Sequence, residues 1–227
     1  MPLARCNGIN LYYEVHGSGE PLLLVAGRGQ DHHSWDAVRG DFTGQHQVIV
    51  YDHADTGSSD PVGQQPRGAR AIAGDALGLL NYLGLRRAHL FGVLEGGEVC
   101  QWLAIDHPER TGAIVLGCSS AIDMGDGDGA EDEAAARQGR ASEGKLHYPA
   151  DEGHDSRDRL AEMTAPVLVI CGTEDLKAPA ANTPRLAERI PGAEQYLVDV
   201  GRHGYMGEHR DKVSRVVLDF LRRNRLG

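Results

Sequence analysis

Asp175, His203 and Leu94 mark the positions at which this 227-residue chain could hold a catalytic site. Each follows a short apolar run, and Leu94 stands in the middle of the glycine-containing turn 92–97. An aspartate fixes the tautomer of a neighbouring histidine and stabilises its imidazolium form. Asp175 and His203 are therefore candidates for a general-base pair that works near neutral pH, and Leu94 is a candidate for an apolar pocket wall.

A second group of residues could bind a negatively charged oxygen. Gly27 and Arg28 follow another apolar run, and Glu95 comes directly after Leu94. Backbone N–H groups in such turns can bind an oxyanion, so Arg28 and Glu95 are candidates for this role. Two interpretations of the charged Arg28 and Glu95 side chains stay open. In the first, they form an ion pair with each other or are simply solvated. In the second, Arg28 binds an anionic group of the substrate.

The elements that must position these residues alternate along the chain. Amphipathic stretches with apolar residues three and four positions apart predict helices. Short continuous apolar runs between them are typical of strands in a sheet covered on both faces. The pattern predicts an α/β fold with a mostly parallel, doubly wound sheet. The expected strands are 11–15, 21–26, 48–51, 88–92, 113–117, 167–171 and 195–200, and the expected helices are 70–83, 98–107, 186–190 and 209–223.

The turn 92–97, with a strand before it and a helix after it, resembles the nucleophile elbow of the α/β-hydrolase fold family, G-x-S-x-G-G. Gly92, Gly96 and Gly97 occupy the glycine positions, and Leu94 stands where the family has serine. The resemblance covers nearly the whole chain outside residues 119–164. It implies an α/β-hydrolase fold.

The resemblance also implies roles for the other site residues. Asp175 corresponds to the family's acid and His203 to its histidine, in the family's chain order. The loop 25–29 is similar to the oxyanion loop, although Ala26 replaces its usual histidine. The turn 51–59 resembles D-x-R-G-x-G-x-S, with alanine and aspartate in place of the arginine and its following glycine.

Leucine cannot form an acyl-enzyme, so covalent hydrolysis at the elbow is excluded. A base that faces an oxyanion site can abstract a proton next to a carbonyl group. The family also contains lyase-type members. Together with the missing serine, this resemblance favours a cofactor-independent, non-hydrolytic enzyme. Its Asp175–His203 dyad would catalyse an elimination or cyclisation on a small carbonyl substrate, such as a natural-product intermediate. Two alternatives remain: an inert pseudo-hydrolase that binds a ligand or partner, and serine-independent ester hydrolysis by water or Glu95.

Residues 1–227 are predicted to form a single domain in which residues 119–164 make a short acidic cap or lid. The acidic, glycine-rich part of this segment does not fit a calcium-binding EF-hand loop, because Met124 falls at the first ligand position. No cofactor and no metal are expected. The four cysteines, Cys6, Cys100, Cys118 and Cys171, are widely spaced and are interpreted as free, buried thiols.

The composition bears on partners and location. A formal net charge of −10 repels nucleic acid and anionic membranes, so a small-molecule substrate is the expected partner. No apolar run approaches the ~20 residues of a membrane span, and the first residues lack the apolar core of a signal peptide. We therefore expect a cytoplasmic protein.

Overall fold

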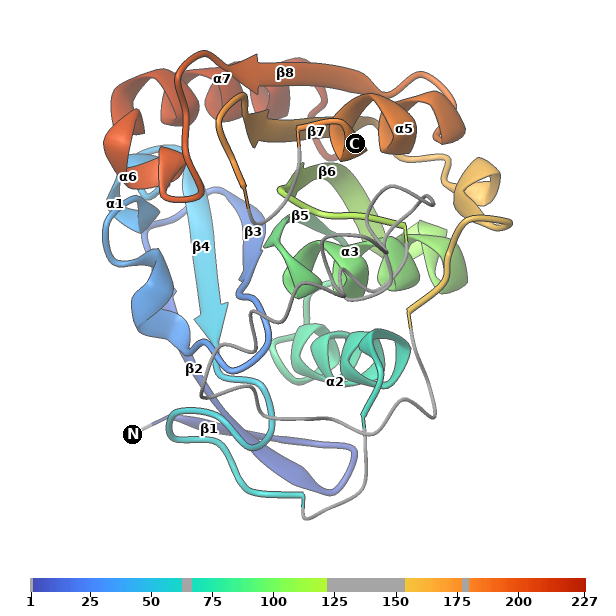
Figure 1. The fold of residues 1–227 in the computed structure, drawn as a ribbon. Coiled ribbons are helices and arrows are strands. Elements are labelled where there is room, and N and C mark those ends of the chain that lie inside the picture. Colours follow the sequence, from blue (N-terminus) through green and yellow to red (C-terminus); the bar gives the residue numbers. More distant parts are fainter. Residues whose placement is uncertain (1, 63–66, 122–153, 177–179) are drawn as a thin grey trace, which may run out of the picture.

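The computed structural model describes residues 2–62, 67–121, 154–176 and 180–227 (Figure 1). These residues form an 8-stranded sheet in the order β1-β2-β4-β3-β5-β6-β7-β8. The first two strands pair antiparallel, and β2 pairs antiparallel with β4. All later neighbours pair parallel. The predicted α/β-hydrolase fold with a mostly parallel, doubly wound sheet is confirmed.

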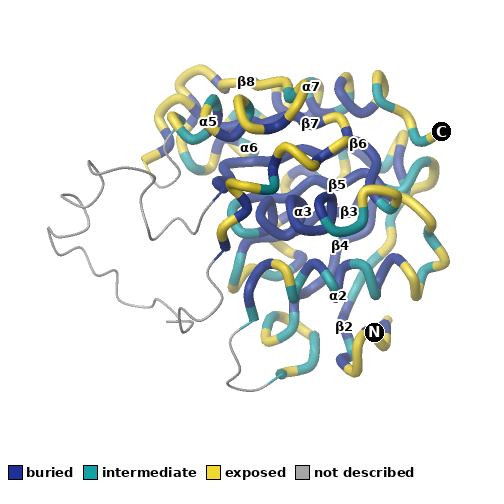
Figure 2. Tube along the Cα trace, turned by 90° about the vertical axis from the view of Figure 1, so that its right-hand side faces the viewer, coloured by how far each residue is buried: buried dark blue, intermediate teal, exposed yellow. Residues whose placement is uncertain are grey.

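The strands run over the apolar segments that the sequence indicates. Their bounds are β1 Leu3–Cys6, β2 Ile9–His16, β3 Glu20–Val25, β4 His46–Tyr51, β5 Ala88–Val93, β6 Thr111–Gly117, β7 Val167–Gly172 and β8 Glu194–Val198. Every residue of β5, β6 and β7 is buried, because helices cover both faces of the central sheet (Figure 2).

The helices divide between the two faces. Their bounds are η1 His32–Trp35, α1 Arg39–Phe42, α2 Ala69–Tyr82, α3 Glu95–Asp106, η2 Pro108–Arg110, η4 Leu160–Glu162, α5 Asn182–Arg189, α6 Tyr205–Glu208 and α7 Arg210–Arg223. One apolar core joins α2, α3 and α5 to the sheet, and a second joins η1, α1, α6 and α7 to the opposite face. Alternate residues of a strand enter opposite cores, as Leu23 and Leu24 of β3 do.

The structure extends some predicted elements and adds others. The four-residue strand β1 was not predicted, since Leu3 is exposed at the edge of the sheet and so short a run carries little pattern. α3 begins at Glu95, three residues before the predicted start, because the elbow leads straight into the helix. α5 begins at Asn182 rather than 186, with the polar Thr183 buried in its first turn.

The described ends of the predicted cap segment 119–164 lie side by side. The backbone N–H of Ser156 donates to the carbonyl of Ala121 over 2.8 Å, and its hydroxyl donates to Gln101 Oε1 over 2.7 Å. Gln101 in turn donates to the carbonyl of Ser120. Residues 122–153, which include the acidic stretch, lie outside the described residues. The cap and the single-domain organisation stay predictions.

Candidate active site

Leu94 lies at a strained turn between β5 and α3. Its backbone adopts φ 54° and ψ −126°, a conformation that costs a residue with a side chain about 1–3 kcal/mol. The turn is held on both sides. Leu94 N–H donates to the carbonyl of Gly117 over 2.9 Å, and the Leu94 carbonyl accepts from Gly97 N–H over 2.9 Å. The backbone thus has the conformation and hydrogen bonds of a nucleophile elbow, although the Leu94 side chain has no nucleophilic atom.

The three elbow glycines are required by close contacts with neighbouring segments. A Cβ at Gly92 would lie 2.2 Å from the carbonyl oxygen of Gly96, and one at Gly96 would lie 2.1 Å from that of Val25. At Gly97 a Cβ would lie 2.5 Å from the Cβ of Ser119. A side chain at these positions would force α3 away from β5, from the end of β3 or from Ser119 after β6, so these glycines allow the compact elbow.

The structure brings Asp175 and His203 together. His203 Nδ1 lies 3.0 Å from Asp175 Oδ1 and 2.9 Å from Oδ2. The Asp175 side chain is fully buried, whereas 30% of the His203 side chain is exposed. Because a carboxylate accepts, Nδ1 carries the proton of the neutral ring and Nε2 keeps a lone pair. This arrangement can accept a proton at Nε2.

The acid turn and the histidine loop are joined through their backbones. Glu174 N–H donates to the carbonyl of Gly201 over 2.8 Å, and Val200 N–H donates to the hydroxyl of Thr173 over 2.9 Å. A Cβ at Gly172 would lie 2.1 Å from the Gly201 oxygen. The separation between the carboxylate and the imidazole is thus fixed by packing between two loops that are distant in sequence.

The histidine loop also meets the elbow strand. A Cβ at Gly117 of β6 would lie 2.9 Å from the Tyr205 hydroxyl and 3.0 Å from Cγ1 of Val93. Tyr205 is two residues after His203, and Val93 directly precedes Leu94. The Tyr205 and Val93 side chains therefore both lie next to Gly117, at the carboxyl ends of the central strands.

The predicted oxyanion site holds a carboxylate. Arg28 N–H donates to Glu95 Oε2 over 3.4 Å, and the same oxygen lies 3.3 Å from a Cβ built at Gly27. Gly27 N–H is also engaged, by Gln30 Oε1 at 3.2 Å. The Glu95 carboxylate thus lies at the expected oxyanion donor, and the role of Arg28 and Glu95 as an oxyanion site stays a prediction. Glu95 reaches this donor because its position at the start of α3 directs its side chain toward the oxyanion loop.

A second Asp–His pair joins η1 to the turn that resembles D-x-R-G-x-G-x-S. His32 Nδ1 lies 2.7 Å from Oδ1 of the buried Asp52, and Asp52 Oδ2 accepts from Ser58 N–H over 2.8 Å. The His32 side chain is 8% exposed, against 30% for His203. This pair supports a turn, whereas the exposed His203 can meet a substrate.

The sequence did not predict that two cysteines contact each other and the carboxylate of Asp175. Cys118 Sγ lies 3.2 Å from Cys171 Sγ and 3.2 Å from Asp175 Oδ2. All three residues are buried. The available signal was positional: Cys118 follows the end of β6 and Cys171 lies at the end of β7, which are neighbouring parallel strands.

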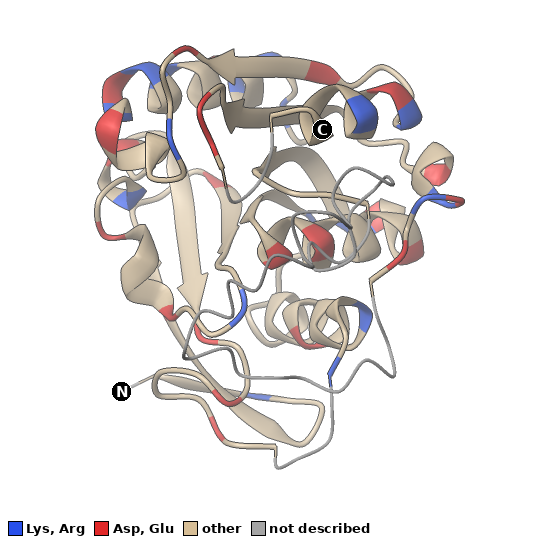
Figure 3. Ribbon diagram, in the orientation of Figure 1, with Lys and Arg blue, Asp and Glu red and all other residues tan. Residues whose placement is uncertain are grey.

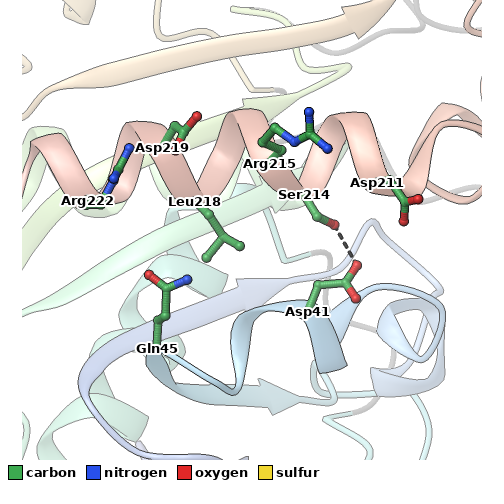
Figure 4. Close-up of a pocket in the computed structure, with 8 residues that line it drawn as sticks. All are labelled: Asp41, Gln45, Asp211, Ser214, Arg215, Leu218, Asp219 and Arg222. Carbon is green, nitrogen blue, oxygen red and sulfur yellow. Dashed lines mark hydrogen bonds and ion pairs between the residues drawn. The ribbon is translucent and has the colours of Figure 1, made fainter.

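Two grooves of about 460 Å³ each lie on the described surface. One is next to the oxyanion loop and is lined by Gly29, Gln30, Asp31, Ser34, Asp55, Thr56 and Gly57. The other lies between α1 and α7 and contains none of the predicted site residues (Figure 4). Basic and acidic residues are mixed along α7, whose sequence is RDKVSRVVLDFLRR (Figure 3). The predicted small-molecule partner, and the expected lack of nucleic-acid or membrane partners, stay predictions.

A family model for the alpha/beta hydrolase fold matches residues 20–138, which is more than half of the chain. The chain therefore belongs to the α/β-hydrolase fold family, as its elbow and acid turn indicated. Among the described residues, no helix is both long and apolar enough to cross a membrane.

Similar proteins are hydrolases. A protein of Azorhizobium caulinodans named "Putative carbamate hydrolase RutD" is 30% identical over 97% of this chain and 98% of its own length. "Rhodomycin D methylesterase DnrP" of Streptomyces peucetius is 34% identical over 63% of this chain and 48% of its own. The enol-lactonase of Burkholderia xenovorans LB400 is 25% identical, with a TM-score of 0.80 over 96% of this chain and 99% of its own.

These relatives overturn the predicted reaction. The expectation of a non-hydrolytic, lyase-type enzyme for elimination or cyclisation in natural-product biosynthesis is wrong, because the relatives are named as hydrolases. The loss of the serine hydroxyl pointed away from hydrolysis only under the assumption that hydrolysis needs a covalent intermediate. The comparisons indicate an enzyme of the α/β-hydrolase family and point to hydrolysis.

Proposed function

We propose that this protein hydrolyses a small ester- or carbamate-type substrate by direct attack of water, without an acyl-enzyme. The observation that carries the proposal is the His203–Asp175 contact of 2.9 Å beside an elbow that holds Leu94. A base whose orientation is fixed by a buried carboxylate can activate water. Leu94 offers no atom for covalent catalysis.

The reaction balances with the groups present. His203 Nε2 takes a proton from water while the water oxygen bonds to the acyl carbon. The carbonyl electrons move to oxygen and form a tetrahedral oxyanion. When the oxyanion collapses, the bond to the alcohol or amine breaks, and the His203 imidazolium returns its proton to the leaving group. Asp175 stabilises the imidazolium between the two steps.

Arg28 and Glu95 control where the oxyanion forms. The Arg28 N–H now donates to Glu95 Oε2 over 3.4 Å, which is a long and weak hydrogen bond. A substrate carbonyl oxygen that takes this N–H displaces the Glu95 carboxylate, and the backbone N–H of Glu95 is the second donor expected from the elbow. Since a nearby carboxylate repels the developing negative charge, Glu95 lowers the rate in this mechanism rather than raising it.

The substrate class is inferred from the relatives' names. Carbamates, methyl esters and enol-lactones share an acyl carbon bonded to an oxygen or nitrogen leaving group. The Leu94 wall favours an apolar portion next to that carbon. The charged groove beside the oxyanion loop, which includes Asp31 and Asp55, favours a polar or cationic substituent on the remainder of the molecule.

A matched pair of 4-nitrophenyl acetate and 4-nitrophenyl carbamate tests the proposal. We expect the wild-type protein to release nitrophenolate from at least one of them above the buffer rate, and Leu94→Ala to remain active within about tenfold, since no bond forms at that side chain. A wild-type rate equal to buffer for both substrates, with and without added metal ions, would overturn the proposal. Complete inactivity of a folded Leu94→Ala variant would also count against it.

A further inference from the structure

Cys118, Cys171 and Asp175 form a compact cluster of potential metal ligands. The two sulfur atoms are 3.2 Å apart, and Asp175 Oδ2 lies 3.2 Å from Cys118 Sγ and 3.9 Å from Cys171 Sγ. The three residues are 5%, 1% and 4% exposed, respectively. Two thiols and one carboxylate oxygen therefore point at a common centre inside the protein.

We propose that Cys118, Cys171 and Asp175 bind one thiophilic divalent metal ion of the zinc class. Zinc bonds of about 2.3 Å to sulfur and about 2.1 Å to oxygen place tetrahedral ligands about 3.6–3.8 Å apart. Relative to the separations in the structure, each pair moves by about 0.6 Å or less to meet this geometry. Three protein ligands leave the fourth position for water.

The charges of the cluster suit a divalent cation. All three ligand side chains are buried, so a bound cation would be shielded from water and would interact strongly with the ligand charges. Binding releases the two thiol protons to solvent and leaves two thiolates, one carboxylate and one M²⁺. The resulting charge of −1 lies next to His203, whose protonated ring can balance it.

The backbone holds the two sulfurs in this position without a disulfide. Cys118 N–H donates to the carbonyl of Ile170 over 2.9 Å, and Cys118 adopts φ 47°, which turns its side chain out of the strand geometry of β6. A disulfide needs the two sulfurs at ~2.05 Å, about 1.1 Å nearer than they are. A tetrahedral zinc ion needs them about 0.6 Å farther apart, which is the smaller movement.

A second cluster of the described residues, Glu20, His46 and His89, is a weaker candidate. His89 Nδ1 accepts from Ala113 N–H over 3.0 Å, so the neutral ring carries its proton on Nε2, the atom that faces Glu20. A metal on Nε2 would require the other tautomer and place two N–H groups against each other. This cluster serves as the control for the cysteine site.

Metal titration of the reduced full-length protein tests the site. All four thiols are first counted, and Zn²⁺ or Cd²⁺ is then added without a competing thiol reagent. We expect one tightly bound ion per chain, two sulfur ligands at about 2.3 Å in the zinc X-ray absorption spectrum, and a cadmium–thiolate ultraviolet band. The affinity should rise with pH, because two thiol protons are released.

Variants assign the ligands. Cys118→Ser and Cys171→Ser should each weaken binding at least about 100-fold, whereas Cys6→Ser, Cys100→Ser and His46→Gln should bind as the wild type does. Absence of a bound ion in the reduced wild-type protein, a spectrum with fewer than two sulfur ligands, or unchanged binding in both Cys118→Ser and Cys171→Ser would overturn the proposal. The spectrum of the wild-type protein decides the matter if a variant fails to fold.

Metal binding and the proposed hydrolysis are separable. The ion count and the spectrum need no substrate, so they test the metal site even if no ester or carbamate is turned over. If hydrolysis occurs, the bound ion withdraws charge from Asp175 Oδ2, the oxygen 2.9 Å from His203 Nδ1. We then expect Zn²⁺ to slow hydrolysis and a chelator to restore it in the same sample.

Discussion

The elbow and the acid–histidine turns are held by the same kind of backbone contacts but differ in chemistry. At the elbow, Gly92 and Gly96 pack so closely against backbone oxygens that a Cβ added at either residue would lie about 2 Å from one of them. Leu94 there has a positive φ of 54°. At the other end of the site, Gly172 packs as closely against Gly201. The acid end retains its functional side chains, whereas the elbow has none.

The difference shows that geometry and reactivity at this site are separable. The strained conformation of Leu94 persists because the hydrogen bonds to Gly117 and Gly97 determine it, whatever side chain it carries. The base depends instead on a side-chain contact between Asp175 and His203. The covalent step is therefore removed without disturbing the base, and the predictions that follow probe each end in turn.

The largest effect is expected from removing the base. His203→Ala should lower kcat for a hydrolysed ester about 10²–10⁴-fold, because it removes the base that Asp175 orients. Steady-state kinetics measure the change in kcat, and circular dichroism shows whether the variant is folded. His33→Ala removes an exposed histidine paired with Asp36 and should leave kcat unchanged. Equal rates for the two variants would contradict the role of His203.

A smaller effect is expected from separating the two turns. Gly172→Ala places a Cβ 2.1 Å from the Gly201 oxygen and should lower stability by about 1–3 kcal/mol, with a loss of kcat as Asp175 and His203 move apart. Urea denaturation measures the loss of stability, and steady-state kinetics measure the loss of kcat. Gly74→Ala in α2, where an added Cβ meets nothing within 4 Å, should instead be neutral or slightly stabilising. Similar losses in both variants would count against the contact.

The smallest effect is expected at the elbow itself. Glu95→Gln removes the negative charge beside the Arg28 N–H while keeping a side chain of the same size. If His203 is the base, kcat/KM should rise by up to about tenfold, because the developing oxyanion is no longer repelled. A loss of 100-fold or more would instead identify Glu95 as the base and contradict the assignment. Glu188→Gln on the exposed face of α5 is the control.

The sequence predicts the sheet and the main helices because their apolar periodicity is a property of single segments. It also predicts the family, since Gly92, Gly96 and Gly97 are required by close contacts that leave no room for a side chain. The side-chain arrangement at the site depends on distant packing. That Glu95 turns toward Arg28, and that Cys118 meets Cys171, follows from the spacing between β3, β5, β6 and β7, which no local pattern encodes.

The reaction type was predicted wrongly for a related reason. A missing nucleophile shows which bond cannot form, but the same base and oxyanion site serve proton abstraction and water attack equally well. The relatives named as hydrolases supply the distinction that Leu94 and His203 do not.

Intact-protein mass spectrometry during turnover tests the central claim most directly. With a slowly released aryl ester in excess, we predict that the wild-type protein turns over while its mass stays unchanged, and that Leu94→Ser gains one acyl group, since the elbow, Asp175 and His203 are already in place. An acyl group on the wild-type chain, formed and lost at the rate of turnover, would contradict the account, because it would show a covalent nucleophile other than residue 94.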